Sequence, residues 1–518
     1  MTSEQERAEL HRVIWQMANE LRGSVDGWDF KAYVLGMLFY RFISENITHF
    51  INAGEDNDFD YTQFSDDEAE SGREETIKDK GFYILPSELF CNVRKNANND
   101  DNLNETLHRV FKNIENSAKG TASEELFKGL FDDLDVNSPK LGTTVKERNH
   151  KLTRIMDAIG DLRLGTYQQH SIDTFGDAYE YLMNMYASNA GKSGGEFFTP
   201  QEVSELLAKI TTQGKQKVKK VYDPACGSGS LLLQIAKVAG KDTVEEFYGQ
   251  EINITTYNLC RINMLLHDIN YTKINIAHGD TLLYPSSEHD EARPFDVVVS
   301  NPPYSIKWAG DSNPILINDE RFSPAGILAP KSKADLAFVM HILSWLAPDG
   351  VAAIVEFPGV LYRGGAEKKI RQYLIDNNYI DTVIQLPANL FFGVSIATCI
   401  IVLKRSKTNN DVLFIDASNE YIKATNKNQL SPDNIENILK VYTERTSKEY
   451  FSNIVSNVDI ANNDYSLSVS SYVAQEDTRE EIDIVELNKE IAEIVAKQNI
   501  LRSAIDAIVA DLEGMNNE

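Results

Sequence analysis

A tetrapeptide after a short apolar run carries the most specific chemistry in the chain. Asn301-Pro302-Pro303-Tyr304 directly follows residues 295–300, which have the composition of a strand. Two successive prolines stiffen the backbone and remove two donors, so the carbonyl groups here are fixed acceptors. The Asn301 amide oxygen and the Pro302 carbonyl can therefore accept the hydrogens of an exocyclic amine, which makes that amine more nucleophilic. Tyr304 supplies a face that stacks on the ring bearing the amine.

A glycine turn upstream predicts a ligand that the backbone approaches closely. Residues 221–232 read as a strand that leads through Asp223, Gly227, Ser228 and Gly229 into a helix. Free N–H groups at the start of such a helix suit a carboxylate or a phosphate. The dinucleotide fingerprint needs a third glycine where this turn has Leu232, so we do not expect a nicotinamide enzyme.

Two acidic residues close the next two predicted strands. Glu251 ends residues 246–251, and Asp280 follows residues 274–278. An acid at the first position can accept both hydroxyls of a ribose, and a carboxylate at the second lies beside the base. Each acid taken alone is also explained by a helix cap or a turn. Because both follow the glycine turn in order, we predict that they line a nucleoside pocket.

Short β-branched runs alternate with helical patterns through the middle of the chain. The predicted strands are residues 218–223, 246–251, 274–278, 295–300, 351–356 and 382–385. This alternation favours an α/β fold with a mostly parallel sheet that helices cover on both faces. Residues 398–404 follow after a connection too short for a crossover helix, so we expect the last strand to enter antiparallel, as a hairpin.

The two ends of the chain lack this alternation. Apolar spacing predicts an N-terminal helical domain over residues 1–165, with an acidic loop or lid at 53–81. We take residues 166–410 as the catalytic domain and residues 411–479, where the pattern weakens, as an irregular connecting region. Residues 480–514 carry a heptad seam interrupted at Gln498, which is typical of a helix that pairs with a partner helix. The alternative is a helix packed on its own domain.

Composition excludes several classes of protein. The 518 residues, 42% hydrophobic and 25% charged, are typical of a globular protein with more than one folded unit. We find no run long enough to span a membrane and no secretory signal, so we expect a cytoplasmic protein. The four scattered cysteines predict no metal site. A formal net charge of -27 is the wrong sign for gripping a polyanion without a more basic partner.

Taken together, these motifs resemble those of amino-group DNA methyltransferases. The Asn-Pro-Pro-Tyr sequence favours the adenine-N6 enzymes over the cytosine-N4 enzymes. Gly195-Glu196-Phe197-Phe198-Thr199-Pro200 resembles the family's segment at the methionine end of the cofactor, and its place ahead of the glycine turn resembles the gamma order. The resemblance implies a Rossmann-like methyltransferase sheet, S-adenosylmethionine as cofactor, and transfer of a methyl group to N6 of a flipped-out adenine.

The same resemblance implies roles for individual residues. Asn301 and the Pro302 carbonyl would bind the adenine N6. Tyr304 and Phe392 would sandwich the base, since residues 389–393 resemble the loop that holds it in these enzymes. The cofactor residues would be Phe198, Thr199 and the Gly227-Ser228-Gly229 backbone around the methionine portion, Asp223 at its amino group, Glu251 at the ribose and Asp280 at the adenine.

Beyond the catalytic motifs, the chain resembles the modification subunits of type I restriction-modification enzymes nearly end to end. The helical front, residues 363–371, residues 464–468 and the heptad helix all contribute to this likeness, while Cys226 stands where alanine is usual. The resemblance implies DNA as substrate and a specificity subunit that selects the sequence and joins two modification subunits. It also implies a restriction subunit in the full complex.

Two alternative functions remain at this point. The tetrapeptide also suits a side-chain amide, so methylation of a protein glutamine or of an RNA base is one alternative. A non-catalytic assembly scaffold is the other. Cations that follow the tetrapeptide either line a path for phosphates or are solvated surface charges; they are Lys307, Arg321, Lys331, Lys333, Arg363, Lys368, Lys369 and Arg371.

Overall fold

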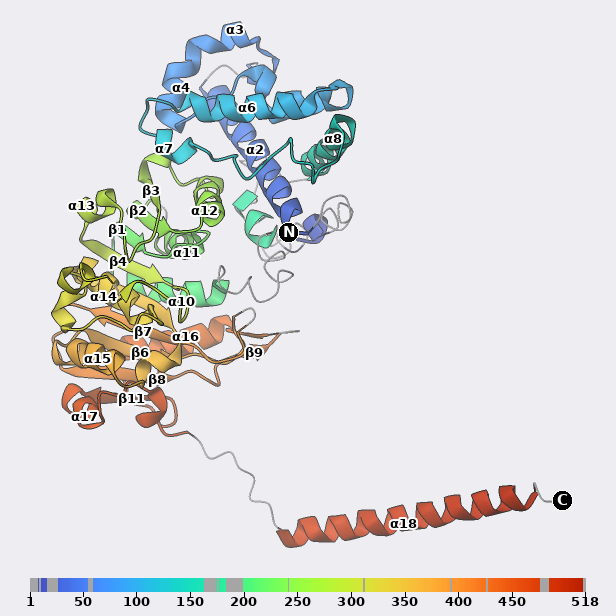
Figure 1. The fold of residues 1–518 in the computed structure, drawn as a ribbon, viewed down its shortest axis with the longest axis vertical. Helices are drawn as coiled ribbons and strands as arrows, with labels where there is room; N and C mark the ends of the chain where they lie inside the picture. The colour runs from blue at the N-terminus through green and yellow to red at the C-terminus, as the bar shows by residue number, and fades with distance from the viewer. Residues whose placement is uncertain are drawn as a thin grey trace. The chain divides into compact units, whose positions relative to one another are not determined.

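The chain forms two compact units, residues 1–474 and residues 475–518. The computed structural model describes residues 8, 11–15, 27–54, 59–162, 175–176, 178–182, 199–240, 242–310, 313–391, 394–424, 427–475 and 484–515. Figure 1 shows the ribbon from the N-terminal helices through the sheet to the C-terminal helix. Among these residues, no helix is both long and apolar enough to cross a membrane.

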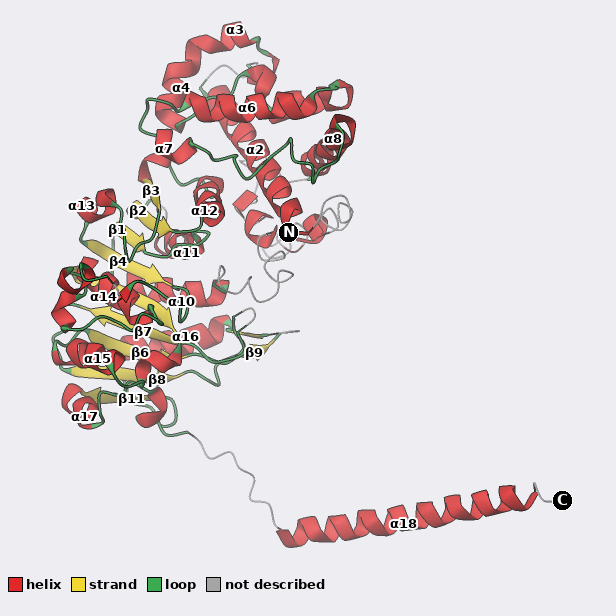
Figure 2. Cartoon of the chain, viewed as in Figure 1, coloured by secondary structure: helices red, strands yellow, loops and turns green. Residues whose placement is uncertain are grey.

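The central element is a nine-stranded sheet with the order β11-β8-β6-β7-β5-β4-β1-β2-β3 (Figure 2). Its strands are β1 Val218–Asp223, β2 Val244–Glu251, β3 Ile274–His278, β4 Phe295–Ser300, β5 Leu346–Glu356, β6 Ile380–Gln385, β7 Cys399–Lys404, β8 Asp411–Asp416 and β11 Ser452–Ser456. Strands β3, β2, β1, β4 and β5 are parallel neighbours. Strand β7 lies antiparallel between β5 and β6, which confirms the predicted hairpin and fold class.

The sheet continues beyond residue 410, so the prediction of an irregular region over residues 411–479 was wrong. Strand β8 pairs in parallel with β6, and β11 pairs antiparallel with β8. Between them helix α16, Pro432–Glu444, begins with a capping box made by Ser431 and Asn434. These strands are short additions at one end of the sheet and carry no motif. Only their pairing, β8 with β6 and β11 with β8, identifies them as part of the sheet. A small hairpin, β9 Ile422–Lys423 and β10 Asn428–Gln429, precedes α16.

Helices cover both faces of the sheet because side chains alternate across each strand. Val297, Val299 and Val355 face one apolar core, shared with helices α10, α11, α12 and α16. Val298 and Ile354 face the other, shared with helices α14 and α15. The bounds of these helices are α10 Gln201–Thr212, α11 Ser230–Ala239, α12 Ile254–Leu266, α14 Asp335–Trp345 and α15 Ala366–Asp376. The central strands are therefore held on both sides, and their carboxyl ends are fixed in space.

Short helices complete this region. They are α13 Ser287–Ala292, α17 Asn457–Asn462, and the 3-10 turns η6 Tyr271–Lys273, η8 Leu316–Asn318, η9 Ser323–Ala325, η10 Pro358–Leu361 and η11 Val469–Ser471.

The N-terminal region is helical, as predicted. Its main helices are α2 Gly27–Ala53, α5 Phe90–Asn96, α6 Leu103–Ser117, α7 Glu124–Phe127 and α8 Val145–Asp161, with 3-10 turns η1 Tyr61–Gln63, η2 Glu70–Gly72, η3 Pro86–Glu88 and η4 Ala97–Asn99. Helix α8 shows why they form: Thr144 and Glu147 make a capping box, and Leu152, Ile155 and Ile159 form one buried face.

The described part of the acidic segment 53–81, residues 53–54 and 59–81, is not the loop or lid that its composition predicts. It folds into α3, Asp66–Ala69, and α4, Arg73–Lys80. Ser65 and Glu68 form a capping box, and the acidic residues of the first turn of α3 favour the positive end of the helix dipole. The capping hydrogen bonds stabilise these short helices although they contain few apolar residues. Most of their side chains are polar and face the solvent.

Arg261 on helix α12 connects the N-terminal helical region to the sheet domain through hydrogen bonds. Its guanidinium on α12 is 1% exposed and donates to the carbonyl oxygens of Glu125, Leu126 and Lys128 at 2.9–3.0 Å. Asn258 of the same helix donates to Asp133 at 2.9 Å. Because α12 begins just after Glu251, the N-terminal region supports one wall of the site described below.

The second unit contains one long helix, α18, Ile484–Met515, which confirms the helix predicted there. The seam residues Ile484, Leu487, Ile491, Ile494, Leu501, Ile505 and Ile508 are 44–69% exposed. The side chain of Leu512 lies outside the described residues. A helix with so many uncovered apolar side chains gains little stability alone, since helices in proteins depend on a packed face.

Candidate active site

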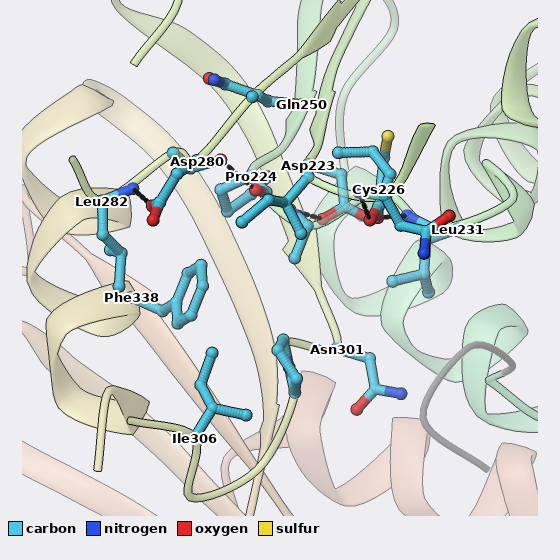
Figure 3. Close-up of a pocket in the computed structure, with 18 of the residues that line it drawn as sticks. Asp223, Pro224, Cys226, Leu231, Gln250, Asp280, Leu282, Asn301, Ile306 and Phe338 are labelled. Atoms are coloured by element: carbon cyan, nitrogen blue, oxygen red, sulfur yellow. Dashed lines mark hydrogen bonds between the residues drawn. The ribbon is translucent and has the colours of Figure 1, made fainter. Parts of the chain in front are cut away.

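A cavity of about 360 Å³ opens at the carboxyl ends of β1, β2 and β4 (Figure 3). In an α/β sheet this edge is where ligands bind, and the volume suits a small organic cofactor. The predicted residues on its wall are Thr199, Asp223, Gly227, Ser228, Glu251, Asp280, Asn301 and Pro303. The fold thus brings together residues from across a 105-residue stretch of sequence, between Thr199 and Pro303.

The glycine turn contributes Gly227 to the cavity wall. Gly227 and Gly229 both have positive φ, 53° and 79°, and Gly229 is the N-cap of α11. A Cβ atom at Gly229 would lie 2.8 Å from the Cys260 sulfur, which is closer than real side chains pack. Gly229 is therefore required by both its backbone conformation and the space around it. It is not itself on the cavity wall.

Asp223 presents an unused acceptor in a buried position. Its Oδ1 accepts hydrogen bonds from the Ala225 amide at 3.0 Å and from the Ser300 hydroxyl at 2.9 Å. Its Oδ2 is buried and has no partner among the described residues. Burial raises the pKa of Asp223 to about 7, although the two hydrogen bonds oppose the shift. A cationic group in the cavity would supply the missing partner.

Ser228 adds an unused hydroxyl to the same wall. It is 3% exposed, and its Oγ has no partner within the described part of the chain. An unpaired acceptor on Asp223 and an unpaired hydroxyl on Ser228 match the two ends of an amino-acid group, one ammonium and one carboxylate.

Glu251 and Asp280 are both partly engaged by backbone amides. Glu251 accepts from Gly227 at 3.0 Å and from Asn253 at 2.8 Å, one on each carboxylate oxygen. Asp280 accepts from Leu282 and Leu283 at 2.9 and 3.1 Å through one oxygen, and Figure 3 marks the first of these bonds. Each carboxylate is fixed in orientation and keeps acceptor capacity for a ligand hydroxyl or amine. Burial raises the pKa of Glu251.

An apolar wall, which the sequence did not predict, faces these acids. Ile306, Trp308 and Phe338 line the cavity, and Figure 3 shows Ile306 and Phe338 directed into it. Phe338 lies on α14, 34 residues after Tyr304 in the sequence, in a helix with apolar residues all round. Nothing in the local pattern separates it from its core neighbours, so no sequence signal identifies it. The wall provides a flat apolar surface for a heterocycle.

The predicted catalytic loop, residues 301–304, begins where β4 ends. The Asn301 amide nitrogen donates to the Thr199 hydroxyl at 3.0 Å, and the Tyr304 hydroxyl donates to the Asn301 amide oxygen at 2.6 Å. Pro302 is buried, while Pro303 lies on the cavity wall. The Tyr304 ring meets Phe391 edge-on, with centroids 6.5 Å apart. Asn301 therefore stands at the junction of the cofactor-sized cavity and an aromatic pair.

Some predicted residues cannot be placed. Gly195, Glu196, Phe197, Phe198 and Phe392 lie outside the described residues. Pro200 is described, and it is the N-cap of α10 rather than part of the cavity wall. Within the described ranges, no group of three or more His, Cys, Asp or Glu side chains is arranged to hold a metal ion.

The predicted phosphate path is only partly compatible with the structure. Arg321 and Arg371 are 4% and 1% exposed and donate to carbonyl oxygens, so they cannot face DNA. Lys307 and Lys331 are exposed, and Lys333 is half-buried. Backbone bonds from Trp308 to Lys331, 3.0 Å, and from Ala334 to Ile306, 2.9 Å, hold these three lysines together next to the catalytic loop.

Comparison with known proteins identifies the family. Residues 170–481 match the family described as N-6 DNA Methylase, and residues 10–159 match the HsdM N-terminal domain. The chain belongs to the N-6 DNA methylase family. The methylase match begins before the glycine turn and continues past the last strand of the sheet. It therefore includes the described cavity and the whole catalytic loop.

Full-length relatives define the type of methylase. The chain is 50% identical to the type I restriction enzyme MpnII methylase subunit of Mycoplasma pneumoniae, over 98% of this chain and 97% of the relative. It is 31% identical to the MjaVIII methylase subunit of Methanocaldococcus jannaschii, over 84% and 76%. The protein is thus a type I methylase subunit that methylates N6 of adenine in DNA, within a restriction-modification complex. This confirms the predicted reaction over the protein, RNA and scaffold alternatives.

Solved structures agree with this family fold. A type I methyltransferase subunit from Streptococcus thermophilus aligns with a TM-score of 0.81 and 37% identity, over 90% of this chain and 99% of that one. A chain from a structural study of type I complex assembly aligns with a TM-score of 0.65 at 19% identity, which supports the fold alone.

Proposed function

We propose that the cavity binds S-adenosylmethionine and that the catalytic loop presents the target adenine to it. The observation that carries this proposal is the shared wall: the unused acceptor of Asp223 and the amide of Asn301 line one cavity. S-adenosylmethionine, when bound, supplies a methyl group attached to a positively charged sulfur. The residues present fit this cofactor in its charged, hydroxylated and aromatic parts.

The fit of S-adenosylmethionine to the cavity follows from the polar groups of the cavity residues that can still form hydrogen bonds. Asp223 Oδ2 would accept from the ammonium of the methionine portion, and the Ser228 hydroxyl would donate to its carboxylate. Glu251 would receive the ribose hydroxyls, and Asp280 the adenine amino group. Ile306 and Phe338 would lie against the adenine ring. Thr199 completes the methionine end together with the predicted residues 195–198.

The catalytic loop would act on a base taken out of the duplex, because a stacked base hides its amino group. The Asn301 amide oxygen and the Pro302 carbonyl accept the two N6 hydrogens. This draws the nitrogen lone pair out of conjugation with the ring and directs it toward the cavity. Tyr304 stacks on the base, and Phe392 supports its other side. The Asn301 oxygen already accepts from the Tyr304 hydroxyl, so the adenine amine would use the second lone pair of that oxygen or displace the hydroxyl.

Partners supply what the chain lacks. With a net charge of -27, the chain needs help to hold DNA. We propose that helix α18 pairs with helices of a specificity subunit, that two methylase subunits join one specificity subunit, and that a restriction subunit completes the assembly. Lys307, Lys331 and Lys333 would contact phosphates beside the target base.

The decisive experiment measures labelled methyl transfer from S-adenosylmethionine to DNA with and without the cognate specificity subunit, followed by nucleoside analysis. N6-methyladenine formed by the parent complex and lost in the Asn301→Ala complex, with cofactor binding retained, would support the proposal. Full activity of Asn301→Ala would refute the assigned role of the loop.

A further inference from the structure

The side chain of Arg321 is buried against a turn that contributes to the cavity wall. It is 4% exposed. Its Nη1 donates to the Thr281 carbonyl oxygen at 2.9 Å, and its Nη2 donates to the Leu282 carbonyl oxygen at 2.8 Å. The Asp319 carboxylate accepts from Nε at 3.0 Å and from Nη2 at 2.7 Å. Nη1 also lies 3.2 Å from Nδ1 of His341.

These contacts use all five N–H groups of the guanidinium, which are arranged in a fixed plane. A guanidinium can only donate, so Nδ1 of His341 must accept and the ring proton lies on Nε2. That nitrogen is 3.0 Å from the Tyr222 hydroxyl oxygen on β1. Burial, and then the charge of Arg321, lower the pKa of His341 well below its ordinary value, so the ring is neutral. The bidentate Asp319 carboxylate therefore balances the buried charge, and the orientation of Arg321 is fixed.

The two carbonyl groups belong to a turn that itself lines the cavity. Asp280, Thr281 and Leu282 all lie on the cavity wall. The Asp280 carboxylate accepts from the Leu282 amide at 2.9 Å (Figure 3). The Thr281 hydroxyl donates to the Pro224 carbonyl oxygen at 2.6 Å, which ties the turn to the end of β1. The amides of the turn thus orient Asp280, while Arg321 holds the carbonyl groups of the same turn.

Arg321 also links this turn to the apolar wall of the cavity. Its guanidinium carbon lies 4.7 Å from the ring centroid of Phe322, which is buried. The Phe322 ring meets the Trp308 ring edge-on, with centroids 5.4 Å apart, and Trp308 lines the cavity. The Trp308 indole in turn donates to the Pro330 carbonyl oxygen at 3.1 Å. Arg321 and Phe322 therefore connect the polar turn to an aromatic side chain of the apolar wall.

We propose that Arg321 is a positioning residue for the adenine end of the cavity, where it holds the Asp280–Leu282 turn in the orientation that binds the cofactor. Arg321 is not itself on the cavity wall, so it acts through the turn. The proposal rests on the assignment of S-adenosylmethionine to this cavity. A lysine here has three donors on one nitrogen and no planar fork, so it cannot satisfy both carbonyl groups and the carboxylate together.

The first test measures ligand binding by the complex with the specificity subunit. The ligands are S-adenosylmethionine and 5′-methylthioadenosine, which keeps the adenine and ribose but lacks the amino-acid group. Arg321→Lys should weaken both by a similar factor, about tenfold or more, because hydrogen bonds from a charged donor are lost.

Arg371→Lys provides the matched control for a buried arginine. Arg371 is 1% exposed and donates to the carbonyl oxygens of Val360 and Tyr465, both at 2.9 Å. Neither of these residues lines the cavity. The affinity of the Arg371→Lys complex for both ligands should therefore equal that of the parent. An equal loss in the two arginine variants would overturn the proposal, because any buried arginine would then have the same effect.

Asp223→Asn distinguishes the two ends of the cavity. It should weaken S-adenosylmethionine and leave 5′-methylthioadenosine unchanged, because Asp223 is assigned to the ammonium group. If Arg321→Lys shows that same selective loss, or no loss at all, its role at the adenine end is wrong. A parent complex that binds neither ligand would refute the cofactor assignment itself, and this role with it.

Methylation kinetics separate positioning from a general loss of stability. Arg321→Lys should raise the KM for S-adenosylmethionine by the factor seen in Kd, and kcat at saturating cofactor should stay within about threefold of the parent. A protein that is merely destabilised has fewer active molecules, so its apparent kcat falls while KM stays the same. That second pattern would overturn the proposal.

Chemical rescue tests the directed hydrogen bonds. Ethylguanidinium replaces the part of the side chain that Arg321→Ala removes, and at concentrations too low to denature the complex it should restore cofactor affinity. Ethylammonium carries the same charge without the planar fork and should not restore it. Equal rescue by both cations would show that charge alone is sufficient, and would overturn positioning by the guanidinium fork.

Discussion

The Tyr304 hydroxyl donates to the Asn301 amide oxygen at 2.6 Å, so the acceptor proposed for the adenine amine is already in use. The nitrogen of the same amide donates to Thr199. Both ends of the Asn301 amide thus have partners before a base arrives. The base either uses the second lone pair of the oxygen or exchanges its hydrogen bond for that of the Tyr304 hydroxyl. Such an exchange costs little net free energy, because the bond lost and the bond gained are similar.

Tyr304→Phe should therefore change kcat/KM for DNA by less than about tenfold, since it keeps the ring and removes one hydrogen bond with a net value of about 1 kcal/mol. Tyr304→Ala should lose about 1–3 kcal/mol of base stacking and reduce kcat/KM by about 5- to 150-fold. Methylation rates of the assembled complex on one DNA duplex would measure both. Equal losses in the two variants would show that the hydroxyl, and not the ring, is what matters.

S-adenosylmethionine binding should weaken in acid because Asp223 has a pKa of about 7. The ionised carboxylate pairs with the ammonium, so Kd should rise about tenfold for each pH unit from about pH 7 to about pH 5. Asp223→Asn should bind more weakly at neutral pH and lose most of this slope. Calorimetry in buffers of different ionisation enthalpy would also detect about half a proton released per cofactor at pH near 7.

A control separates Asp223 from its acidic neighbour. Glu251 also has a raised pKa and lines the same cavity. Glu251→Gln should bind the cofactor less tightly but keep the pH slope. A slope that disappears with Glu251→Gln and persists with Asp223→Asn would reverse the two assignments.

Replacing Lys307, Lys331 and Lys333 together by glutamine should weaken DNA binding by the complex at every sequence. Each phosphate contact contributes about 0.9 to the slope of log affinity against log salt, so the slope should fall by about 2–3. Lys217 and Lys219, exposed at the amino end of β1, provide a control, with the change in slope compared per lysine removed. If the control pair lowers the slope equally, the effect is general charge and not a local phosphate contact.

Charged substitutions in the apolar seam of helix α18 should prevent its pairing with the specificity subunit. Ile494→Glu with Leu501→Glu places two carboxylates on the seam, while Ala496→Glu with Ser503→Glu adds the same charge on the opposite face. Size-exclusion chromatography with the specificity subunit should show no complex for the seam variant and a normal complex for the control. Cofactor binding should survive in both, because α18 belongs to a separate compact unit.

Much of the fold could be predicted because its signals are local. Strands β1 to β4 are short apolar runs, and each is followed by a residue type with a recognisable task, such as Asp223, Glu251 or Asn301. Strands β8 and β11, at one end of the sheet, carry no motif of this kind, so they were missed. The helices of residues 61–80 were missed because acidic composition outweighed their capping residues in the prediction.

The sequence by itself determined the chemistry. The acceptor tetrapeptide, the glycine turn and the acids that follow it can be identified from residue types and spacing alone. The tertiary structure decided which of these groups are free. It left an acceptor of Asp223 unpaired, occupied the Asn301 oxygen with Tyr304, and brought Phe338 to the cavity wall from a distant helix. The physical reason is that hydrogen-bond satisfaction and burial depend on neighbours in space, which residue type and spacing along the chain do not specify.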